Sequence, residues 1–196
     1  MPLRSQPVRR LSNGANGRNR GFTLVELAIT LTVLGVLMAV AIPGFRLVQN
    51  SSRLSAAAND LVASLQAARM EAIRRNGRVV LCSSADAATC SGDGTSGGWL
   101  VFADADADAA VDVGEEIILA NAVPAPLTLK ANTAVTEGIV MFRSDGMARS
   151  KGGQLLTGQI RVCMADTVPA DNVRNVAIGA GGRVRVERAS TAGVCD

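Results

Sequence analysis

The sequence of 196 residues contains no histidine and no tyrosine, and only one tryptophan and four phenylalanines. Without histidine, the chain lacks the commonest general acid–base group and the imidazole ligand of many zinc sites. No two cysteines have the C-x-x-C spacing, and no phosphate-binding loop of the G-x-x-x-x-G-K type is present. We therefore expect a protein that binds or assembles rather than an enzyme, and we expect no cofactor. The scarcity of aromatic rings also argues against nucleic-acid recognition by base stacking.

Acidic residues are absent from the first 25 positions, where the charged residues are five arginines: Arg4, Arg9, Arg10, Arg18 and Arg20. Residues 22–45 then contain a single charge, Glu26, within an apolar run. At 1.5 Å per residue this run is long enough to cross a hydrocarbon layer of about 30 Å. The arginines predict that the N-terminus stays in the cytoplasm while the rest of the chain is exported. A secretory signal fits poorly, because Gly21 precedes the apolar run instead of following it.

The junction at residues 21–26 reads G-F-T-L-V-E, and Pro43 follows Phe22 by 21 positions. These residues resemble the class III signal of type IV pilins and type II secretion pseudopilins. The resemblance implies that a prepilin peptidase cuts after Gly21 and methylates Phe22 as the new N-terminus. It also implies that Glu26 pairs with the N-terminal amine of an adjacent subunit in a filament. The alternative is a carboxylate one turn inside the membrane that reaches water.

The pattern of residues predicts an α+β chain in four segments: a leader at 1–21, a transmembrane and filament-core half-helix at 22–48, an amphipathic half-helix at 49–76, and a β-rich soluble domain at 77–196. One helix is expected from about Phe22 to Arg75, ended by Asn76-Gly77. An antiparallel sheet packed on this helix is expected from strands at 78–82, 98–103, 116–120, 139–143, 159–164, 174–178 and 183–188. Trp99, Phe102 and Phe142 are expected in the core.

Two elements of this domain resemble the GspH/FimT branch of minor pilins and pseudopilins. One is the strand Trp99-x-x-Phe102, followed by an acidic turn and a second apolar strand, and the other is Phe142-x-x-x-Gly146. The resemblance implies the type IV pilin fold and a chain anchored in the inner membrane of a Gram-negative bacterium, with its soluble domain in the periplasm. It further implies later assembly into a filament, at its tip, with minor and major pilins or pseudopilins as partners.

All four cysteines, Cys82, Cys90, Cys163 and Cys195, lie in the part expected to be exported. An even number of cysteines in an oxidising compartment predicts disulfides, with three possible connectivities. Proximity along the chain favours Cys82 with Cys90 and Cys163 with Cys195. A zinc site is the weaker alternative, because histidine is absent.

An acidic segment has the spacing of a twelve-residue calcium loop, with candidate ligands Asp104, Asp106, Asp108, Asp112 and Glu115. Ala109 stands where such a loop has glycine, and the flanking residues are predicted strands instead of helices. We therefore expect a solvated hairpin loop, with calcium binding as the alternative.

Positive charge is concentrated at the C-terminal end of the chain. Residues 22–142 carry seven positive and twelve negative side chains, whereas residues 143–196 carry eight positive and five negative ones. The positive group consists of Arg143, Arg149, Lys151, Arg161, Arg174, Arg183, Arg185 and Arg188. This asymmetry predicts a polyanion-binding surface.

The sharpest element of this group is Gly182-Arg183-Val184-Arg185. Period-two spacing places the two arginines on the same strand face, and the first acid on that face is Glu187. The element resembles the G-R-x-R motif of FimT proteins, the minor pilins that bind DNA during uptake in natural transformation. The candidate DNA-binding residues are Gly182, Arg183, Arg185, Arg188, Arg149 and Lys151. The alternative is a structural or initiating minor pilin, or a type II secretion pseudopilin of the protein H type, without DNA binding.

Overall fold

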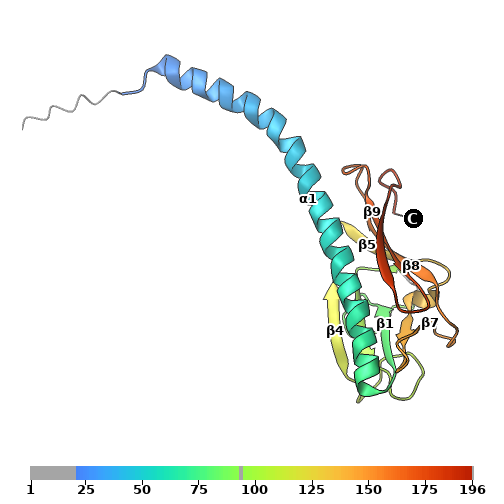
Figure 1. The fold of residues 1–196 in the computed structure, drawn as a ribbon. Coiled ribbons are helices and arrows are strands. Elements are labelled where there is room, and N and C mark those ends of the chain that lie inside the picture. The colour runs from blue at the N-terminus through green and yellow to red at the C-terminus, as the bar shows by residue number, and fades with distance from the viewer. Residues whose placement is uncertain (1–20, 93–94, 196) are drawn as a thin grey trace, which may run out of the picture. The chain divides into compact units, whose positions relative to one another are not determined.

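The computed structural model describes residues 21–92 and 95–195, so the expected leader and its arginines lie outside the described residues, apart from Gly21. Its elements are one α-helix, ten strands and a short 3-10 helix (Figure 1). In chain order they are α1 (Leu24–Arg75), β1 (Val79–Ser83), β2 (Thr95–Ser96), β3 (Gly98–Ala103), β4 (Ile117–Ala122), β5 (Leu127–Ala131), η1 (Thr136–Gly138), β6 (Val140–Phe142), β7 (Ala148–Arg149), β8 (Gly158–Met164), β9 (Val173–Ile178) and β10 (Val184–Ala189). The predicted α+β class is confirmed, and α1 begins two residues after the predicted start.

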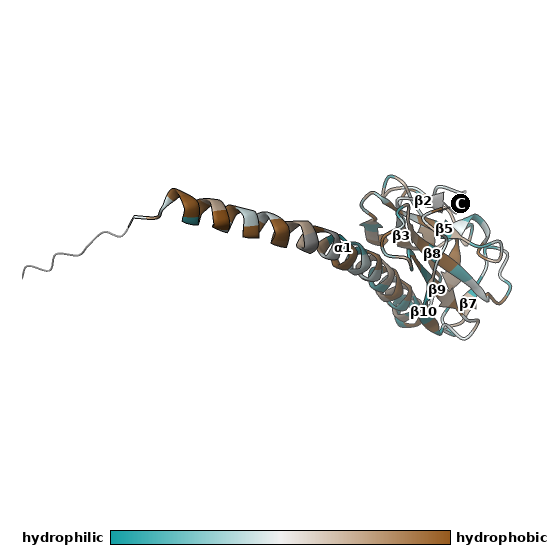
Figure 2. Cartoon of the chain, turned by 90° about the horizontal axis from the view of Figure 1, so that it is seen from above, coloured by the Kyte–Doolittle hydropathy of each residue, from teal (hydrophilic) through white to brown (hydrophobic). Residues whose placement is uncertain are grey.

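The chain divides into a unit that ends at Ala41 and a unit that runs from Ile42 to the C-terminus. In the first unit the described residues of α1 are exposed and mostly apolar (Figure 2). By length and composition, α1 is the one helix in the described part of the chain that could cross a membrane. Its apolar surface is therefore available for lipid or for other helices.

In the second unit α1 buries a narrow stripe of small and branched residues. Leu54, Ala58, Leu61, Leu65 and Ala68 are completely buried and follow each other at spacings of three and four residues. Such spacing keeps them on one face of a helix, which packs into the main core of the second unit. The helix ends as predicted, at Arg75, and Asn76 follows it.

The helix end is capped by a turn of the Schellman type. Asn76 has φ of 49°, and its amide donates to Ile73 O at 3.2 Å, while the Gly77 amide donates to Ala72 O at 3.1 Å. These bonds satisfy carbonyl groups that the helix would otherwise leave unpaired.

The strands form two five-stranded antiparallel sheets, where the sequence predicted one. Sheet A has the order β4-β3-β1-β6-β7 and sheet B the order β10-β9-β8-β5-β2. All seven predicted strands are present, β3 with its predicted bounds and the other six with one or both ends shifted, and β2, β5 and β7 were missed. Two of these have only two residues, which leave no periodic signal in the sequence.

Sheet A is covered on both faces, because successive side chains of its strands point alternately into two apolar clusters. Trp99 and Phe142 belong to the main core with α1, whereas Phe102 lies in a second cluster with Val80 and Cys82. All three predicted aromatic core residues are thus buried. In sheet B, Leu129, Val162 and Val176 face the main core in the same way, and the opposite face of that sheet carries polar residues.

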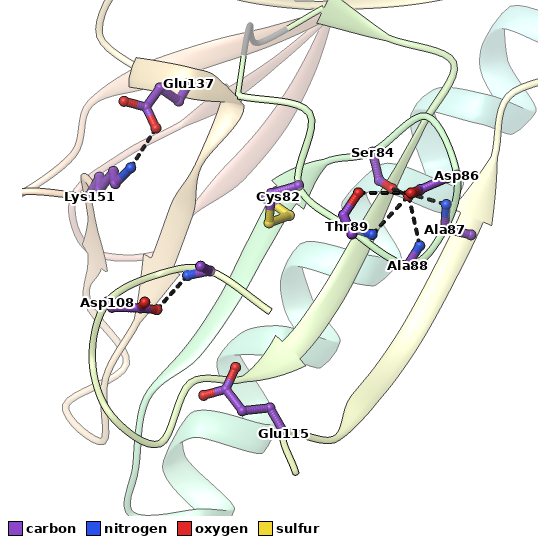
Figure 3. The surroundings of a disulfide bond; sticks show 12 residues. Cys82, Ser84, Asp86, Ala87, Ala88, Thr89, Asp108, Glu115, Glu137 and Lys151 are labelled. Carbon is purple, nitrogen blue, oxygen red and sulfur yellow. Dashed lines mark hydrogen bonds and ion pairs between the residues drawn. A yellow bond between two sulfur atoms is a disulfide. The ribbon is translucent and has the colours of Figure 1, made fainter. Parts of the chain in front are cut away.

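Both expected disulfides are present, Cys82–Cys90 and Cys163–Cys195. The first closes a loop in which Asp86 accepts hydrogen bonds from the amides of Ala88 and Thr89, at 2.9 and 2.8 Å (Figure 3). These bonds hold the pKa of the Asp86 carboxyl well below its usual range. The second disulfide fastens the C-terminal tail against β8.

An exposed ion network joins the end of α1 to the start of β4. Arg75 contacts Glu71 Oε2 at 2.8 Å and Glu116 Oε2 at 2.7 Å, and Arg74 contacts Glu71 at 2.6 Å. The hydrogen bonds from Arg74 and then Arg75 lower the pKa of Glu71 from 4.5 to about 2. The network therefore favours the ionised form of Glu71 in the folded state.

Because the folded-state pKa of Glu71 is depressed, its contribution to stability should be present above pH 4.5 and should be lost as the pH falls towards 2. We expect the melting temperature of the full-length protein in detergent to fall over this range, and to fall less in Glu71→Gln. Melting curves at successive pH values compare the two proteins. Equal acid sensitivity of both proteins would contradict the expectation.

Candidate functional site

The turn between β9 and β10 carries the predicted glycine–arginine element. The Gly179 amide donates to Arg183 O at 2.9 Å, and the Gly182 amide donates to Gly179 O at 2.8 Å. Gly182 has φ of +71°, a left-handed conformation that glycine adopts without steric cost. The glycine before the two arginines is thus required by the backbone of the turn.

This turn also packs closely against α1 and against the Phe142-x-x-x-Gly146 element. A Cβ atom at Gly182 would lie 2.7 Å from Gly146 O and 3.0 Å from Arg69 Nε. Arg69 Nη1 donates to Gly182 O at 3.4 Å, and the Ala148 amide donates to Ala180 O at 2.9 Å. Two elements far apart in the sequence therefore meet at Arg69, a contact that the sequence pattern did not indicate.

Arg183 and Arg185 line one open groove of about 670 Å³, together with Val184 between them. Asn132, Thr157 and Gln159 also line it. Arg185 pairs in register with Ala177 on β9, on the face of sheet B that points away from the core. The groove therefore combines two guanidinium groups with amide and hydroxyl groups, which suits an anion with several oxygen atoms.

Carboxylates approach two of the predicted cations on β10. Arg185 Nε lies 2.7 Å from Glu187 Oε1, and Arg188 Nη1 lies 3.6 Å from Asp171 Oδ2. Within the described residues, Arg183 makes no ion pair. The arginine side chains at 185 and 188 remain 76% and 72% exposed, so both can exchange these partners for a ligand.

Arg149 and Lys151 lie on and just after β7 and have firmer partners. Arg149 Nη2 contacts Asp145 Oδ2 at 2.7 Å. Lys151 Nζ contacts Glu137 Oε2 at 2.6 Å, as Figure 3 shows. The amide of Met147 and then Arg149 lower the pKa of Asp145, so that this pair stays ionised. We expect these two cations to contribute less to ligand binding than Arg183.

Arg174 does not belong to the positive surface group in which it was predicted. Its side chain is 1% exposed, and Nη1 donates to Asp171 O at 2.7 Å and to Val173 O at 3.0 Å. Burial lowers the pKa of this guanidinium from its ordinary value. Arg174 shares the inner face of β9 with Val176 and Ile178. The two-residue spacing of these three positions in the sequence could have predicted that Arg174 points inward.

The acidic segment between β3 and β4 folds back onto sheet A. Carboxylate oxygens of Asp104, Asp106 and Asp108 lie within 4.8 Å of one another, and Ala109 packs into the second apolar cluster. Ala109 has φ of 63° at the position where a calcium loop has glycine.

The carboxylates of this segment hold its own backbone. Asp104 is 3% exposed and lies 3.2 Å from Arg78, and Glu115 accepts from the amides of Ala105 and Asp112. Asp108 and the burial of Asp112 raise the pKa of the Asp112 carboxyl. These contacts give the loop a structural role, and calcium binding stays a hypothesis.

At the other end of the chain, Glu26 occupies the first turn of α1. Thr23 Oγ1 accepts a hydrogen bond from the Glu26 amide at 3.1 Å, and Thr23 O accepts one from the Leu27 amide at 3.1 Å. Thr23 is thus the N-cap, and Glu26 stands at the third helical position, the spacing of a capping box. The contact with Thr23 uses the backbone amide of Glu26, so the predicted intersubunit pairing of its carboxylate stays a prediction.

A long N-terminal helix with an exposed apolar half, packed through its second half on antiparallel sheets, defines the class of type IV pilin-like proteins. The model of the family described as type II transport protein GspH matches residues 57–187, and the model of the prokaryotic N-terminal methylation motif matches residues 16–42. The chain belongs to the GspH family of type IV minor pilins and pseudopilins.

Individual proteins agree with this assignment. The chain is 41% identical to the pilin-like protein PilA1 of Thermus thermophilus over 97 residues, which are 50% of this chain and 56% of that protein. It is 50% identical to the type IV major pilin protein PilA of Myxococcus xanthus over 48 residues, 24% of this chain and 22% of that protein. The chain thus spans about half, or less, of the length of these relatives.

Two crystal structures of the type IV minor pilin FimU from Pseudomonas aeruginosa share the fold at 20% identity. Their TM-scores are 0.50 and 0.52, and they cover 71% and 72% of this chain and 99% and 96% of their own. Together with the family models, they confirm the pilin fold predicted from the sequence.

Proposed function

We propose that this chain is a minor pilin or pseudopilin that prepilin peptidase cleaves after Gly21 and methylates at Phe22. The methylation-motif match and the exposed apolar half of α1 support this proposal. Residues 22–48 then anchor the chain in the inner membrane of a Gram-negative bacterium and later enter the core of a filament with other pilins. Residues 49–76 and 77–196 form the periplasmic part, which is displayed at the filament tip.

We further propose that the tip domain binds DNA for uptake in natural transformation. The observation that carries this proposal is the shared groove of Arg183 and Arg185, presented by a turn that requires Gly182. Two guanidinium groups side by side suit the phosphates of a nucleic-acid backbone. Binding should therefore be independent of sequence and strongly sensitive to salt.

The test is fluorescence polarisation of labelled DNA with the full-length protein in detergent at low salt. We expect micromolar binding that Arg183→Ala with Arg185→Ala weakens about 10- to 100-fold, since each charge-assisted hydrogen bond contributes about 1.5 kcal/mol or more. The control is Arg53→Ala with Arg74→Ala, two exposed arginines of α1, which changes the net charge equally and should leave binding unchanged.

The second candidate is a structural or initiating minor pilin, or a type II secretion pseudopilin, that does not bind DNA. The type II transport description of the matching family favours it, as do the carboxylates beside Arg185, Arg149 and Lys151. Absence of DNA binding by the unmodified protein at low salt would decide for this candidate.

A further inference from the structure

The outer face of sheet B carries more positive charge than the glycine–arginine element alone. Strand alternation places Leu129, Val162 and Val176 in the core, so that the residues between them point outward. Lys130 on β5 and Arg161 on β8 therefore lie on the same outer face as Arg185 on β10. Lys130 was not predicted as a member of the positive surface because β5 was not predicted, although residues 127–131 alternate with period two.

Lys130 and Arg161 are direct partners in the register of β5 and β8. Like charges directly opposite each other on adjacent strands destabilise a sheet. The same row continues through Asn175 to Glu187 on β10, which places that carboxylate two strands away from Arg161. The outer face of sheet B therefore carries two cations on neighbouring strands, which offers a polyanion two adjacent positive contacts.

A second groove, of about 280 Å³, connects these two cations to the first groove. Lys130, Thr133 and Arg161 line it, and both grooves share Asn132 and Gln159. Asn132 Oδ1 accepts from the amides of Val135 and Gln159, at 3.3 and 3.1 Å, which fixes the Asn132 side chain where the grooves meet. The two grooves therefore form one track across β10, β9, β8 and β5.

The length of this track fits an extended ligand. Adjacent strands are about 4.8 Å apart, so β8 lies about 10 Å and β5 about 14 Å from β10. The disulfide-bonded tail limits the track on one side, because Cys163 follows Arg161 on the outer face and is only 1% exposed. Val194 O, 3.6 Å from Cys163 Sγ, belongs to the tail that covers it.

We propose that this track binds successive phosphates of a DNA backbone, with Lys130 and Arg161 as phosphate contacts in addition to Arg183 and Arg185. This inference rests on the proposed DNA binding and extends it across the sheet. None of the described residues that line the two grooves is aromatic, so the ligand is held through its phosphodiester groups rather than its bases.

The experiment measures DNA affinity of the full-length protein in detergent between 50 and 200 mM salt, for Lys130→Gln with Arg161→Gln. We expect about tenfold weaker binding at low salt. The slope of log K against log salt should fall by about 1.8 for duplex DNA or about 1.4 for a single strand, corresponding to two lost phosphate contacts. Lys130→Arg should retain binding, and Arg53→Gln with Arg74→Gln should change neither affinity nor slope.

The outcomes separate the two proposals. In one outcome the unmodified protein binds DNA, and Arg183→Ala with Arg185→Ala abolishes this binding. If Lys130→Gln with Arg161→Gln then keeps both the affinity and the salt slope, the proposal of an extended track is wrong and the proposed function stands. If the unmodified protein binds no DNA, both are wrong. Melting curves accompany each variant, so that a loss of binding through unfolding is distinguished from a loss of phosphate contacts.

Discussion

Chains carrying Glu26→Ala are expected to be inserted into the membrane and cleaved after Gly21, but to be missing from assembled filaments. A carboxylate within an apolar helix costs about 2.5 to 3.5 kcal/mol on insertion scales, so alanine makes insertion easier. In the filament the same carboxylate is expected to neutralise the N-terminal amine of a neighbouring subunit, and its loss leaves that amine unpaired in an apolar core. Immunoblots of membrane and sheared filament fractions measure both effects.

The capping contact of Thr23 makes Glu26→Gln the decisive companion variant. Glutamine can replace glutamate at the third position of a capping box, but it carries no charge. If charge pairing drives assembly, Glu26→Gln is excluded from filaments as strongly as Glu26→Ala. If Glu26→Gln assembles normally, assembly does not need the charge at position 26, and the intersubunit pairing is wrong.

Replacing Gly182 with alanine is expected to destabilise the domain by about 2 to 5 kcal/mol. A left-handed residue with a Cβ atom costs about 1–2 kcal/mol, and overpacking typically costs a further 1–3 kcal/mol or so. The new Cβ would lie 2.7 Å from Gly146 O, and this backbone atom can move only if the whole turn moves. Urea unfolding of the full-length protein in detergent measures the change in the free energy of unfolding.

The neighbouring glycine provides a matched control for this prediction. A Cβ atom at Gly181 would meet no atom within 4 Å, so Gly181→Ala should change stability by less than about 0.5 kcal/mol. Because the turn presents Arg183, Gly182→Ala should also weaken DNA binding, whereas Gly181→Ala should not. Equal stability of the two variants would show that the turn tolerates a side chain at position 182.

Local patterns in the sequence predicted much of this fold. The apolar run and the stripe from Leu54 to Ala68 predicted α1, Asn76-Gly77 predicted its end, and the cysteine spacing favoured the two disulfides that are present. Each of these features depends on residues that are close in sequence. The number of sheets could not be predicted in this way, because it depends on which strands pair across long separations, such as β5 with β8.

The candidate site likewise has features that the local sequence predicts and features that depend on contacts between distant residues. Period-two spacing predicted Arg183 and Arg185 on one strand face, because such a prediction needs only one strand, and both residues line the same groove. The contact of Gly182 with Arg69 joins residues 113 positions apart, and the opposition of Lys130 and Arg161 depends on the order of strands. Arg174 was predicted on the surface because only its charge was considered, and not which face of β9 its position in the strand alternation gives it.

The unequal covering of the two sheets has a consequence for how this protein can change by mutation. In sheet A, residues on both faces are packed, so that nearly every substitution in β1 or β3 alters a core. In sheet B, one face is packed, whereas the other carries polar residues and is bordered on one side by the tail held at Cys163. Charges on that outer face can therefore be gained, lost or exchanged at little cost to folding, and relatives with this scaffold can acquire different ligands through a few surface substitutions.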